Sequence, residues 1–368
     1  MWNTDISRQS VVVEGHRFTA ADRAALLRLG TAAPQEELRA VYAFLSEWFS
    51  DRPYMEVQTS GSTGVPKRMR AGKKQMMHSA CRTCEFLGLK KDDTALLCMN
   101  LKYIGAMMMV VRALVAEMRL IVRRASSCPL ADVNERVDFL SVVPMQLYHC
   151  VQDADARKRL SQIRCVIVGG GAVDNSLCRQ LQNLPCAVFS TYGMTETLSH
   201  IALRRLNGSE ASERYTPLKG IDLSLSDQST LIIRAPEICR DKIKTNDIAR
   251  LYEDGTFTLS GRTDNVVNSG GIKIQIEEDE QLLRQHLPAP FALTSIPHER
   301  LGEALVLLVQ TDCTLTDSEL QLLLKRSLPR YHAPRSIVRL PRIPETGNGK
   351  TDRKACRELA TKFCKDWR

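Results

Sequence analysis

A short stretch near residue 60 gathers residue types that can hold a phosphate group. Residues 57–67 read VQTSGSTGVPK, with two glycines, several hydroxyls and a closing lysine. Glycine lets the backbone approach an anion closely, and lysine adds a positive charge. The glycines are three residues apart and Pro66 precedes the lysine, so the stretch differs from the P-loop of common NTPases. A polar hairpin turn is the alternative. The candidate phosphate-binding residues are Thr59, Ser60, Gly61, Ser62, Thr63, Gly64 and Lys67.

A second candidate segment, residues 190–200, reads STYGMTETLSH. Tyr192 offers a flat face for a base, Thr195 a hydroxyl, and Glu196 a hard oxygen ligand suited to magnesium. The segment follows a predicted parallel strand, and ligands of open α/β sheets bind at the carboxyl ends of such strands. The glycines 169–171 end the preceding predicted strand in the same way. Their backbone should therefore lie beside the second segment.

Three later motifs carry polar residues that could complete a nucleotide site. Asp247 in TND precedes a β segment, where a carboxylate could hold ribose hydroxyls. Arg262 and Asp264 in GRTDN lie at a predicted domain junction, and Lys350 lies in the glycine-rich loop IPETGNGKTDR. Each motif taken alone is compatible with an ordinary surface loop.

The elements that must position these residues alternate between apolar strands and helices from about residue 93 onward. This alternation predicts a mostly parallel sheet that helices cover on both faces. Pro144 stands at the first position of a helix, which is favourable for proline. The predicted strands are 94–99, 138–143, 165–170 and 186–191, and the predicted helices are 104–117, 173–183 and one that begins at Pro144.

The pattern changes twice in the second half of the chain. Residues 222–236 and 248–262 read as two hairpins, with turns near Asp227 and at Asp254-Gly255. Beyond them we expect a helix at about 277–286, strands near Ala292, Leu305 and Val338, and a helix near Leu320. The sequence thus predicts an α/β protein. Its large N-terminal domain (1–262) has mostly parallel sheets, covering helices and a small β region, and a small mobile α+β domain (263–368) follows.

Composition and charge narrow the classes of function. The 368 residues are 43% hydrophobic, but no run of about 20 apolar residues appears, so no membrane span is expected. Arg112 interrupts the most apolar stretch, residues 107–116, which favours a buried helix.

The start lacks a secretory pattern and the twelve cysteines are scattered, which favours the cytoplasm. Cys81 and Cys84 form a C-x-x-C without further metal ligands nearby, so we interpret them as helix residues. The net charge of +9 is dispersed, and no nucleic-acid-binding pattern accompanies it.

Taken in order, five motifs resemble those of the adenylate-forming superfamily, which includes acyl-CoA synthetases, luciferases and peptide-synthetase adenylation domains. They are TSGSTGVPK, TYGMTET, the aspartate of TND, GRTDNVVNSGGIKI and PETGNGK. The resemblance runs from about Thr59 to Lys350, which is most of the chain. It implies an AMP-binding N-terminal domain with a mobile C-terminal lid.

The resemblance also implies a role for each matching residue, with ATP, Mg²⁺ and coenzyme A as the reactants and cofactors. The ATP phosphates would lie on residues 60–67. The adenine would lie between Tyr192 and the glycines Gly169, Gly170 and Gly171. Thr195 and Glu196 would serve phosphate and magnesium, and Asp247 and Arg262 would bind ribose. Asp264 would be the hinge, Gly270 and Gly271 would line the pantetheine path, and Lys350 would be the catalytic lysine.

The implied reaction has two steps. A carboxylate attacks the α-phosphate of ATP, which forms an acyl-adenylate and releases pyrophosphate. Lys350 stabilises the charge that develops in this step. The lid then rotates about Asp264, withdraws Lys350 and admits the thiol of coenzyme A.

Within the superfamily, the chain resembles the o-succinylbenzoate–CoA ligases of menaquinone synthesis, on the motifs TYGMTETLSHIAL, SVVPMQL and GRTDNVVNSGGIKI. The acyl pocket is expected from residues 101–109, 144–145, 193–194 and 199–200. Lys102, His200 or Arg204 could pair with a second carboxylate. The methionines are equally compatible with plain helix core. Tyr103 stands where many relatives carry histidine. The candidate substrate-binding residues are Lys102, Tyr103, Gly193, Met194, Ser199 and His200.

Three other functions stay open at this level. The chain could be a different aryl- or acyl-CoA ligase, or an adenylating enzyme that loads a carrier protein instead of free coenzyme A. A basic nucleic-acid-binding protein is the third, and the ordered motifs argue against it. The expected partners are a small carboxylic acid and coenzyme A, and a homo-oligomer is compatible with the sequence.

Overall fold

A computed structural model describes residues 2–58, 68–173, 175–287, 289–346 and 350–364. Within these residues, nine strands form the largest sheet, in the order β11-β10-β9-β8-β7-β5-β6-β1-β2. The run from β9 to β1 is parallel, and antiparallel strands close both ends. The strands are β1 (Ser10–Val13), β2 (His16–Thr19), β5 (Thr94–Leu97), β6 (Arg119–Val122), β7 (Phe139–Val142), β8 (Cys165–Val168), β9 (Ala187–Gly193), β10 (His200–Arg205) and β11 (Thr216–Pro217).

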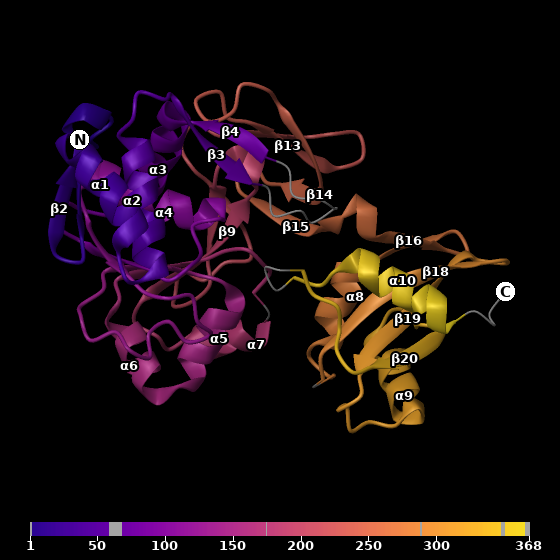
Figure 1. Cartoon of the computed structure of the whole chain (residues 1–368). Coiled ribbons are helices and arrows are strands. Elements are labelled where there is room, and N and C mark those ends of the chain that lie inside the picture. Colours follow the sequence, from indigo (N-terminus) through magenta and orange to yellow (C-terminus); the bar gives the residue numbers. More distant parts are fainter. Residues whose placement is uncertain (1, 59–67, 174, 288, 347–349, 365–368) are drawn as a thin grey trace.

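Both faces of this sheet are buried under helices. On β5, Ala95 and Leu97 face one hydrophobic core and Leu96 faces the other, as the two-residue period of a strand requires. One core packs against α1 (Arg23–Ala32), α2 (Glu36–Trp48), α3 (Lys73–Leu87) and α4 (Ile104–Ala116). The other packs against α5 (Pro144–Gln152), α6 (Ala154–Gln162) and α7 (Asn175–Leu181). The predicted parallel sheet with helices on both faces is confirmed (Figure 1).

Local signals explain where several of these helices begin and end. Helix α5 begins at Pro144, as predicted. Helix α3 ends where Gly88 adopts a left-handed conformation, with φ of 59°. Cys81 and Cys84 lie within α3 and are free thiols, so their interpretation as helix cysteines is confirmed. No helix in the described ranges is long and apolar enough to cross a membrane.

The small β region is an antiparallel sheet of β12 (Asp222–Leu225), β13 (Thr230–Arg234), β14 (Ile243–Leu251) and β15 (Phe257–Arg262). Both predicted hairpins are present, and Gly255 in the second turn has φ of 78°. One detail was wrong: Asp247 lies inside β14 instead of before it. A separate two-stranded ribbon pairs β3 (Tyr54–Gln58) with β4 (Arg68–Gly72).

The remaining sheet, from Val266 onward, has its own cores. It contains β16 (Val266–Ser269), β17 (Ile272–Gln275), β18 (Phe291–His298), β19 (Gly302–Gln310) and β20 (Ser336–Leu340). Helices α8 (Ile276–Leu283) and α9 (Asp317–Ser327) pack on one core, and α10 (Arg353–Phe363) packs on the other. This part lies apart from the large sheet in Figure 1 and is joined to it through the segment that follows β15.

Several elements were absent from the sequence predictions. They include helices α6 and α10, strands β6, β10 and β11, the N-terminal elements β1, β2, α1 and α2, and the short 3-10 helices η1 (Ile6–Arg8), η2 (Ala20–Asp22), η3 (Thr195–Thr197) and η4 (Thr263–Asn265).

Candidate active site

The predicted phosphate loop falls between β3 and β4. Its residues Thr59, Ser60, Gly61, Ser62, Thr63, Gly64 and Lys67 lie outside the described residues. The flanking strands are antiparallel, with Gln58 opposite Arg68, so they bring the two ends of the segment together. β3 and β4 therefore form an antiparallel ribbon on either side of the predicted loop.

Lys73, in the basic cluster after this segment, has a structural role. Its ammonium donates hydrogen bonds to the carbonyl of Glu47 (2.9 Å), in the last turn of helix α2, and to that of Ser50 (2.8 Å), just after the helix ends. Carbonyls at a helix end carry partial negative charge and favour a cation. Burial lowers the pKa of Lys73 to about 8. Lys73 is therefore occupied within the protein and is not a phosphate ligand.

The glycines after β8 lie beside β9, as predicted. A β-carbon on Gly169 would lie 2.7 Å from the hydroxyl oxygen of Thr191, and Gly170 has φ of 82°. Val168 and Ser190 are register partners in the parallel pair, so the two strands end at the same edge of the sheet. The carboxyl end of β8 thus packs too closely on β9 for a side chain at Gly169.

Strand β9 turns back sharply after Gly193 into β10. A β-carbon on Gly193 would lie 2.3 Å from the carbonyl oxygen of Ser199, so only glycine fits. Between them lies η3, where Thr195 is buried and Glu196 is exposed. The hydroxyl of Thr197 fixes this turn by hydrogen bonds to the backbone of Met194 and Ser199. Glu196 is consequently free to meet a ligand from solvent.

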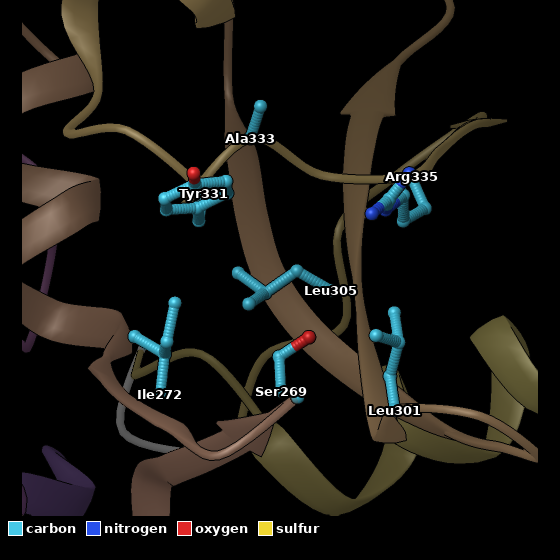
Figure 2. A pocket seen from close by; sticks show the side chains of 8 residues that line it. Ser269, Ile272, Leu301, Leu305, Tyr331, Ala333 and Arg335 are labelled. Carbon is cyan, nitrogen blue, oxygen red and sulfur yellow. The ribbon is translucent and has the colours of Figure 1, made fainter.

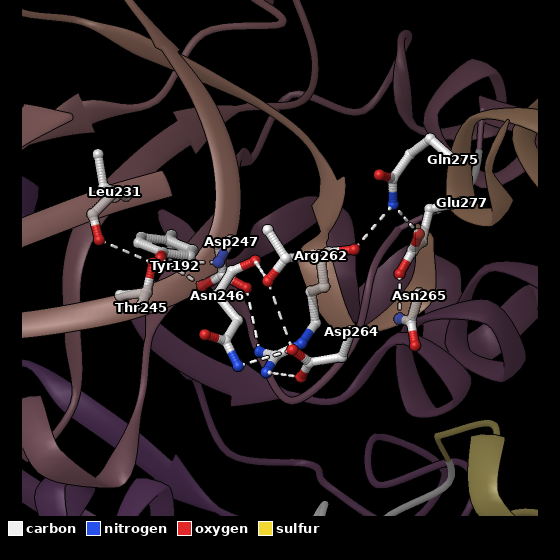
Figure 3. Close-up of polar contacts among 11 residues, drawn as sticks. Tyr192, Leu231, Thr245, Asn246, Asp247, Arg262, Asp264, Asn265, Gln275 and Glu277 are labelled. Carbon is white, nitrogen blue, oxygen red and sulfur yellow. Dashed lines mark hydrogen bonds and ion pairs between the residues drawn. The ribbon is translucent and has the colours of Figure 1, made fainter. Parts of the chain in front are cut away.

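Four predicted nucleotide-binding or hinge residues form one connected network (Figure 3). The hydroxyl of Tyr192 donates to Asp247 (2.6 Å). The guanidinium of Arg262 donates to Asp247 (3.1 Å) and to Asp264 (2.8 Å). Asn246 donates to the other oxygen of Asp264 (2.6 Å). The antiparallel pairing of β14 and β15, with Asp247 opposite Arg262, creates this arrangement.

The environment sets the charge of each network member. Burial, together with the carboxylate of Asp247, raises the pKa of Tyr192, so the phenol stays protonated and donates. Burial alone would raise the pKa of Asp264, but hydrogen bonds from Arg262 and Asn246 outweigh it and lower that pKa. The ring of Tyr192 is only 9% exposed and packs on Phe257, with centroids 5.4 Å apart. Holding Asp247 is therefore the role of Tyr192 that the geometry shows most directly.

Lys350 lies within electrostatic reach of the same network. Its backbone is fixed by hydrogen bonds with Thr346, whereas its side chain is exposed. Nearby protein atoms still desolvate the amine partly, and this effect with the charge of Arg262 lowers the pKa of Lys350, while Asp247 acts in the opposite direction. The charges of Arg262 and Asp247 thus act on Lys350 across the predicted domain boundary.

The structure bears on four residues of the acyl-pocket prediction. His200 is buried, its Nε2 lies 2.9 Å from the hydroxyl of Thr83, and burial lowers its pKa well below the ordinary value. A neutral histidine cannot pair with a carboxylate by charge. Arg204 donates to Glu213 (2.6 Å) and is therefore already paired. Met108 and Met109 are fully buried, so they belong to helix core.

The remaining pocket candidates border helix α4. Lys102 is exposed in the turn before it, and Tyr103 is the exposed N-cap residue. Gly193, Met194 and Ser199 lie in the turn between β9 and β10. The side chain of Ser199 faces α4, because Arg112 donates to it across 2.7 Å.

Sequence reasoning missed Arg112 as a site residue. It is 1% exposed in the middle of α4, and its Nε has no hydrogen-bond partner among the described residues. No carboxylate of the described residues forms an ion pair with it, and burial lowers its pKa to about 10. A buried, unpaired charge is costly. The available signal was the single arginine that interrupts the most apolar stretch of the chain.

A magnesium ion would find few ligands in the described part of the chain. No group of three or more His, Cys, Asp or Glu residues there could hold a metal. Magnesium usually takes one or two carboxylates and completes its shell with substrate phosphates and water. The exposed carboxylate of Glu196 fits that mode, so the residues present are compatible with a magnesium–ATP complex.

A cavity of about 220 Å³ lies in the C-terminal part (Figure 2). Gly270, one of the two predicted pantetheine-path glycines, lines it and has φ of 62°. Tyr331 and Arg335, which were not predicted, also line it and lie across from Ser269 in Figure 2. The cavity therefore combines a flat aromatic ring and a cation beside a backbone that a ligand can approach closely.

Comparison with known proteins identifies the family. The model of the family described as AMP-binding enzyme matches residues 24–237, more than half of the chain. The chain belongs to the AMP-binding enzyme family.

Particular members of the family can also be compared. The acyl-CoA synthetase (AMP-forming)/AMP-acid ligase II-like protein of Dyadobacter fermentans is 30% identical, with a TM-score of 0.62 over 90% of this chain and 96% of that chain. The 2-succinylbenzoate–CoA ligase of Bacillus cereus (strain Q1) is 24% identical over 357 residues, which cover 89% of this chain and 73% of that protein. The o-succinylbenzoate coenzyme A synthetase of Bacillus subtilis, solved with ATP and magnesium, has a TM-score of 0.77 at 18% identity, over 96% and 99% of the two chains.

Proposed function

We propose that the protein is an AMP-forming acid–thiol ligase that adenylates an aryl dicarboxylate, o-succinylbenzoate or a close analogue, and transfers it to coenzyme A. One observation carries the proposal: Tyr192, Asp247, Arg262 and Asp264 form one network, and the charge of Arg262 acts on Lys350. The similarity to 2-succinylbenzoate–CoA ligases supports the choice of acid.

In the first half-reaction, the chain must orient ATP against a carboxylate. Asp247 can accept hydrogen bonds from both ribose hydroxyls, because Tyr192 and Arg262 already fix its position. The substrate carboxylate forms a bond to the α-phosphorus, and the bond to pyrophosphate breaks. Lys350 and Thr195 would stabilise the negative charge that grows on the α-phosphate oxygens. Magnesium, held by Glu196 and the phosphates, would neutralise the leaving pyrophosphate.

The second carboxylate of the acid would meet Arg112. A buried guanidinium with a free Nε can donate to a carboxylate, and such a contact is strong where water is excluded. Ser199, which Arg112 already contacts, would complete the anion site. We prefer Arg112 to Lys102 because an exposed cation contributes little to binding.

In the second half-reaction, the coenzyme A thiol attacks the acyl carbonyl and AMP leaves. We propose the domain boundary between residues 262 and 263, with Asp264 as the hinge and the C-terminal part as the mobile lid. Gly270 and Gly271 would border the pantetheine. The cavity beside them would take the nucleotide end of coenzyme A, because Tyr331 can stack on adenine and Arg335 can pair with phosphate. We place the reaction in the cytoplasm, because the twelve cysteines are scattered along the chain instead of being set in a short disulfide framework.

A substrate panel tests the proposal. Pyrophosphate release from ATP would be measured with o-succinylbenzoate, benzoate and a fatty acid, each with and without coenzyme A. We expect release with o-succinylbenzoate alone and a thioester only when coenzyme A is present. Release with a different acid only would contradict the assigned substrate, and release without any thioester would favour a carrier protein as the acceptor.

A further inference from the structure

Helix α8 buries two neighbouring carboxylates that bind different parts of the C-terminal region. Glu280 receives hydrogen bonds from Arg353 at the start of α10 (2.6 and 2.7 Å) and from the backbone of Leu293. Asp279, which is 2% exposed, contacts His332, whose Nδ1 lies 3.0 Å from each carboxylate oxygen. The Glu280–Arg353 pair holds helix α10, whereas the Asp279–His332 pair holds a loop.

That loop, residues 328–335, leaves helix α9 and leads into β20. Tyr331 adopts φ of 74°, a left-handed conformation that is unfavourable for a bulky side chain. Such strain persists only where the surroundings hold the backbone in place. The backbone N–H of His332 donates to Pro329 (3.1 Å) and that of Arg335 donates to Leu305 (2.9 Å). The His332–Asp279 contact adds a buried attachment between these two points.

The attachment adjoins the cavity directly. Tyr331 and Ala333 line the cavity, and His332 lies between them in the chain but contacts α8 (Figure 2). Tyr331 is 64% exposed, and the guanidinium of Arg330, 4.8 Å from the ring centroid, contacts it from within the same loop. Movement of His332 away from Asp279 would therefore displace both of its cavity-lining neighbours.

We infer that Asp279 and His332 are positioning residues for the acceptor step: they hold the loop so that Tyr331 and Arg335 meet an adenine nucleotide with phosphate groups. This inference rests on the proposed function, in which that nucleotide belongs to coenzyme A. Neither residue lines the cavity or belongs to the candidate ATP and acid sites, because their side chains contact each other on the α8 side of the loop. Their effect should be confined to the second half-reaction.

The test compares full-length variants in both half-reactions. In His332→Ala, the KM for coenzyme A should rise about tenfold, the effect of losing about one good hydrogen bond to a charged group. Pyrophosphate release measured without coenzyme A should change less than about twofold. His332→Asn can still donate to Asp279 and should restore most of the affinity. Direct binding of coenzyme A to the same variants should follow the order of the KM values.

Arg353→Gln is the matched control, because it breaks the neighbouring buried pair without touching the loop. It should lower the melting temperature at least as much as His332→Ala and leave the KM for coenzyme A unchanged. An unchanged KM in His332→Ala, or an equal rise in Arg353→Gln, would overturn the inference.

Tyr331→Ala separates this inference from the proposed function. A weaker affinity for coenzyme A in Tyr331→Ala but not in His332→Ala would keep the cavity as the acceptor site and reject the positioning pair. If wild type forms the thioester and Tyr331→Ala binds coenzyme A normally, coenzyme A binds outside this cavity. The positioning role of Asp279 and His332 is then also rejected. If wild type binds no coenzyme A, the proposed thiol acceptor is itself wrong.

Discussion

The nucleotide side and the acyl side of the candidate site differ in whether their arginine has a carboxylate partner. On the nucleotide side, Arg262 contacts both Asp247 and Asp264, so the chain completes its own charge pairs. On the acyl side, Arg112 is more deeply buried and donates to the neutral hydroxyl of Ser199. The first arrangement is preorganised before a ligand binds. Under the proposed function, the second would leave the anion to be supplied by the acid, which would select a dicarboxylate.

The largest expected effect comes from removing Asp247, the carboxylate that Tyr192 and Arg262 contact. Asp247→Ala would remove the ribose acceptor and leave the buried hydroxyl of Tyr192 without a partner. We expect kcat/KM for ATP to fall on the order of 10³-fold and the free energy of unfolding to fall by about 1–3 kcal/mol. Steady-state kinetics and chemical denaturation measure the two effects. A variant with normal ATP kinetics would remove Asp247 from the nucleotide site.

Removal of the unpaired charge of Arg112 should change the free energy of unfolding in the opposite direction. Arg112→Met removes a buried charge that has no anionic partner, so the free protein should become more stable by about 1–3 kcal/mol. The KM for o-succinylbenzoate should rise about 100-fold, whereas that for a monocarboxylate analogue should not.

Arg204→Met and Lys102→Met are the matched controls for this experiment. Arg204 is already paired with Glu213, and Lys102 is exposed, so both should change the KM for the dicarboxylate much less. If the KM for the dicarboxylate rises in Lys102→Met and not in Arg112→Met, the second carboxylate binds Lys102 instead of Arg112.

Lys350 is proposed to act where ATP and the acid react, so its titration should make the rate of adenylation depend on pH. Its pKa is lowered, so the ammonium is present at low pH and is lost as the pH rises through that lowered value. The kcat/KM of adenylation should therefore fall at an alkaline pH below the ordinary pKa of lysine. Lys350→Arg, which stays charged, should move this limb to higher pH whatever its absolute rate. An alkaline limb at the same pH in both proteins would assign the titration to another group.

The smallest expected effect concerns the hinge. Asn246 donates to Asp264 from an exposed position, which is worth about 0.5–1.5 kcal/mol. Asn246→Gly should therefore shift the balance between the two lid positions about threefold to tenfold, seen as opposite changes in the rates of the two half-reactions. Parallel changes in both rates would mean that Asn246 affects folding or ATP binding instead of the hinge.

Much of the fold could be predicted because local patterns and tertiary structure agree. Pro144 marked the start of α5, and Asp254-Gly255 marked the second hairpin. Helix α10 was missed because the two side chains it buries, Cys356 and Ala360, are small and stand in an otherwise largely polar and charged stretch. The N-terminal strand β1 was missed because its place in the sheet depends on pairing with β6, more than one hundred residues later.

The candidate site was less predictable because its charges depend on tertiary contacts. His200 looked like a polar loop residue, but the close turn after Gly193 buries it against Thr83. Arg112 looked like an interruption in a core helix, and only the structure shows that no carboxylate of the described residues meets it. Residue type and order located the nucleotide motifs, whereas pairing, or its absence, became visible only in three dimensions.

The most direct test of the account separates the two half-reactions in Lys350→Ala. Pyrophosphate release from ATP and o-succinylbenzoate would be measured beside thioester formation from supplied acyl-adenylate and coenzyme A. Because Lys350 is assigned to the first step alone, we predict a loss of adenylation of at least about 100-fold and nearly normal thioester formation. Loss of both activities to the same extent, in a protein that remains folded, would contradict a single site that serves two reactions in turn.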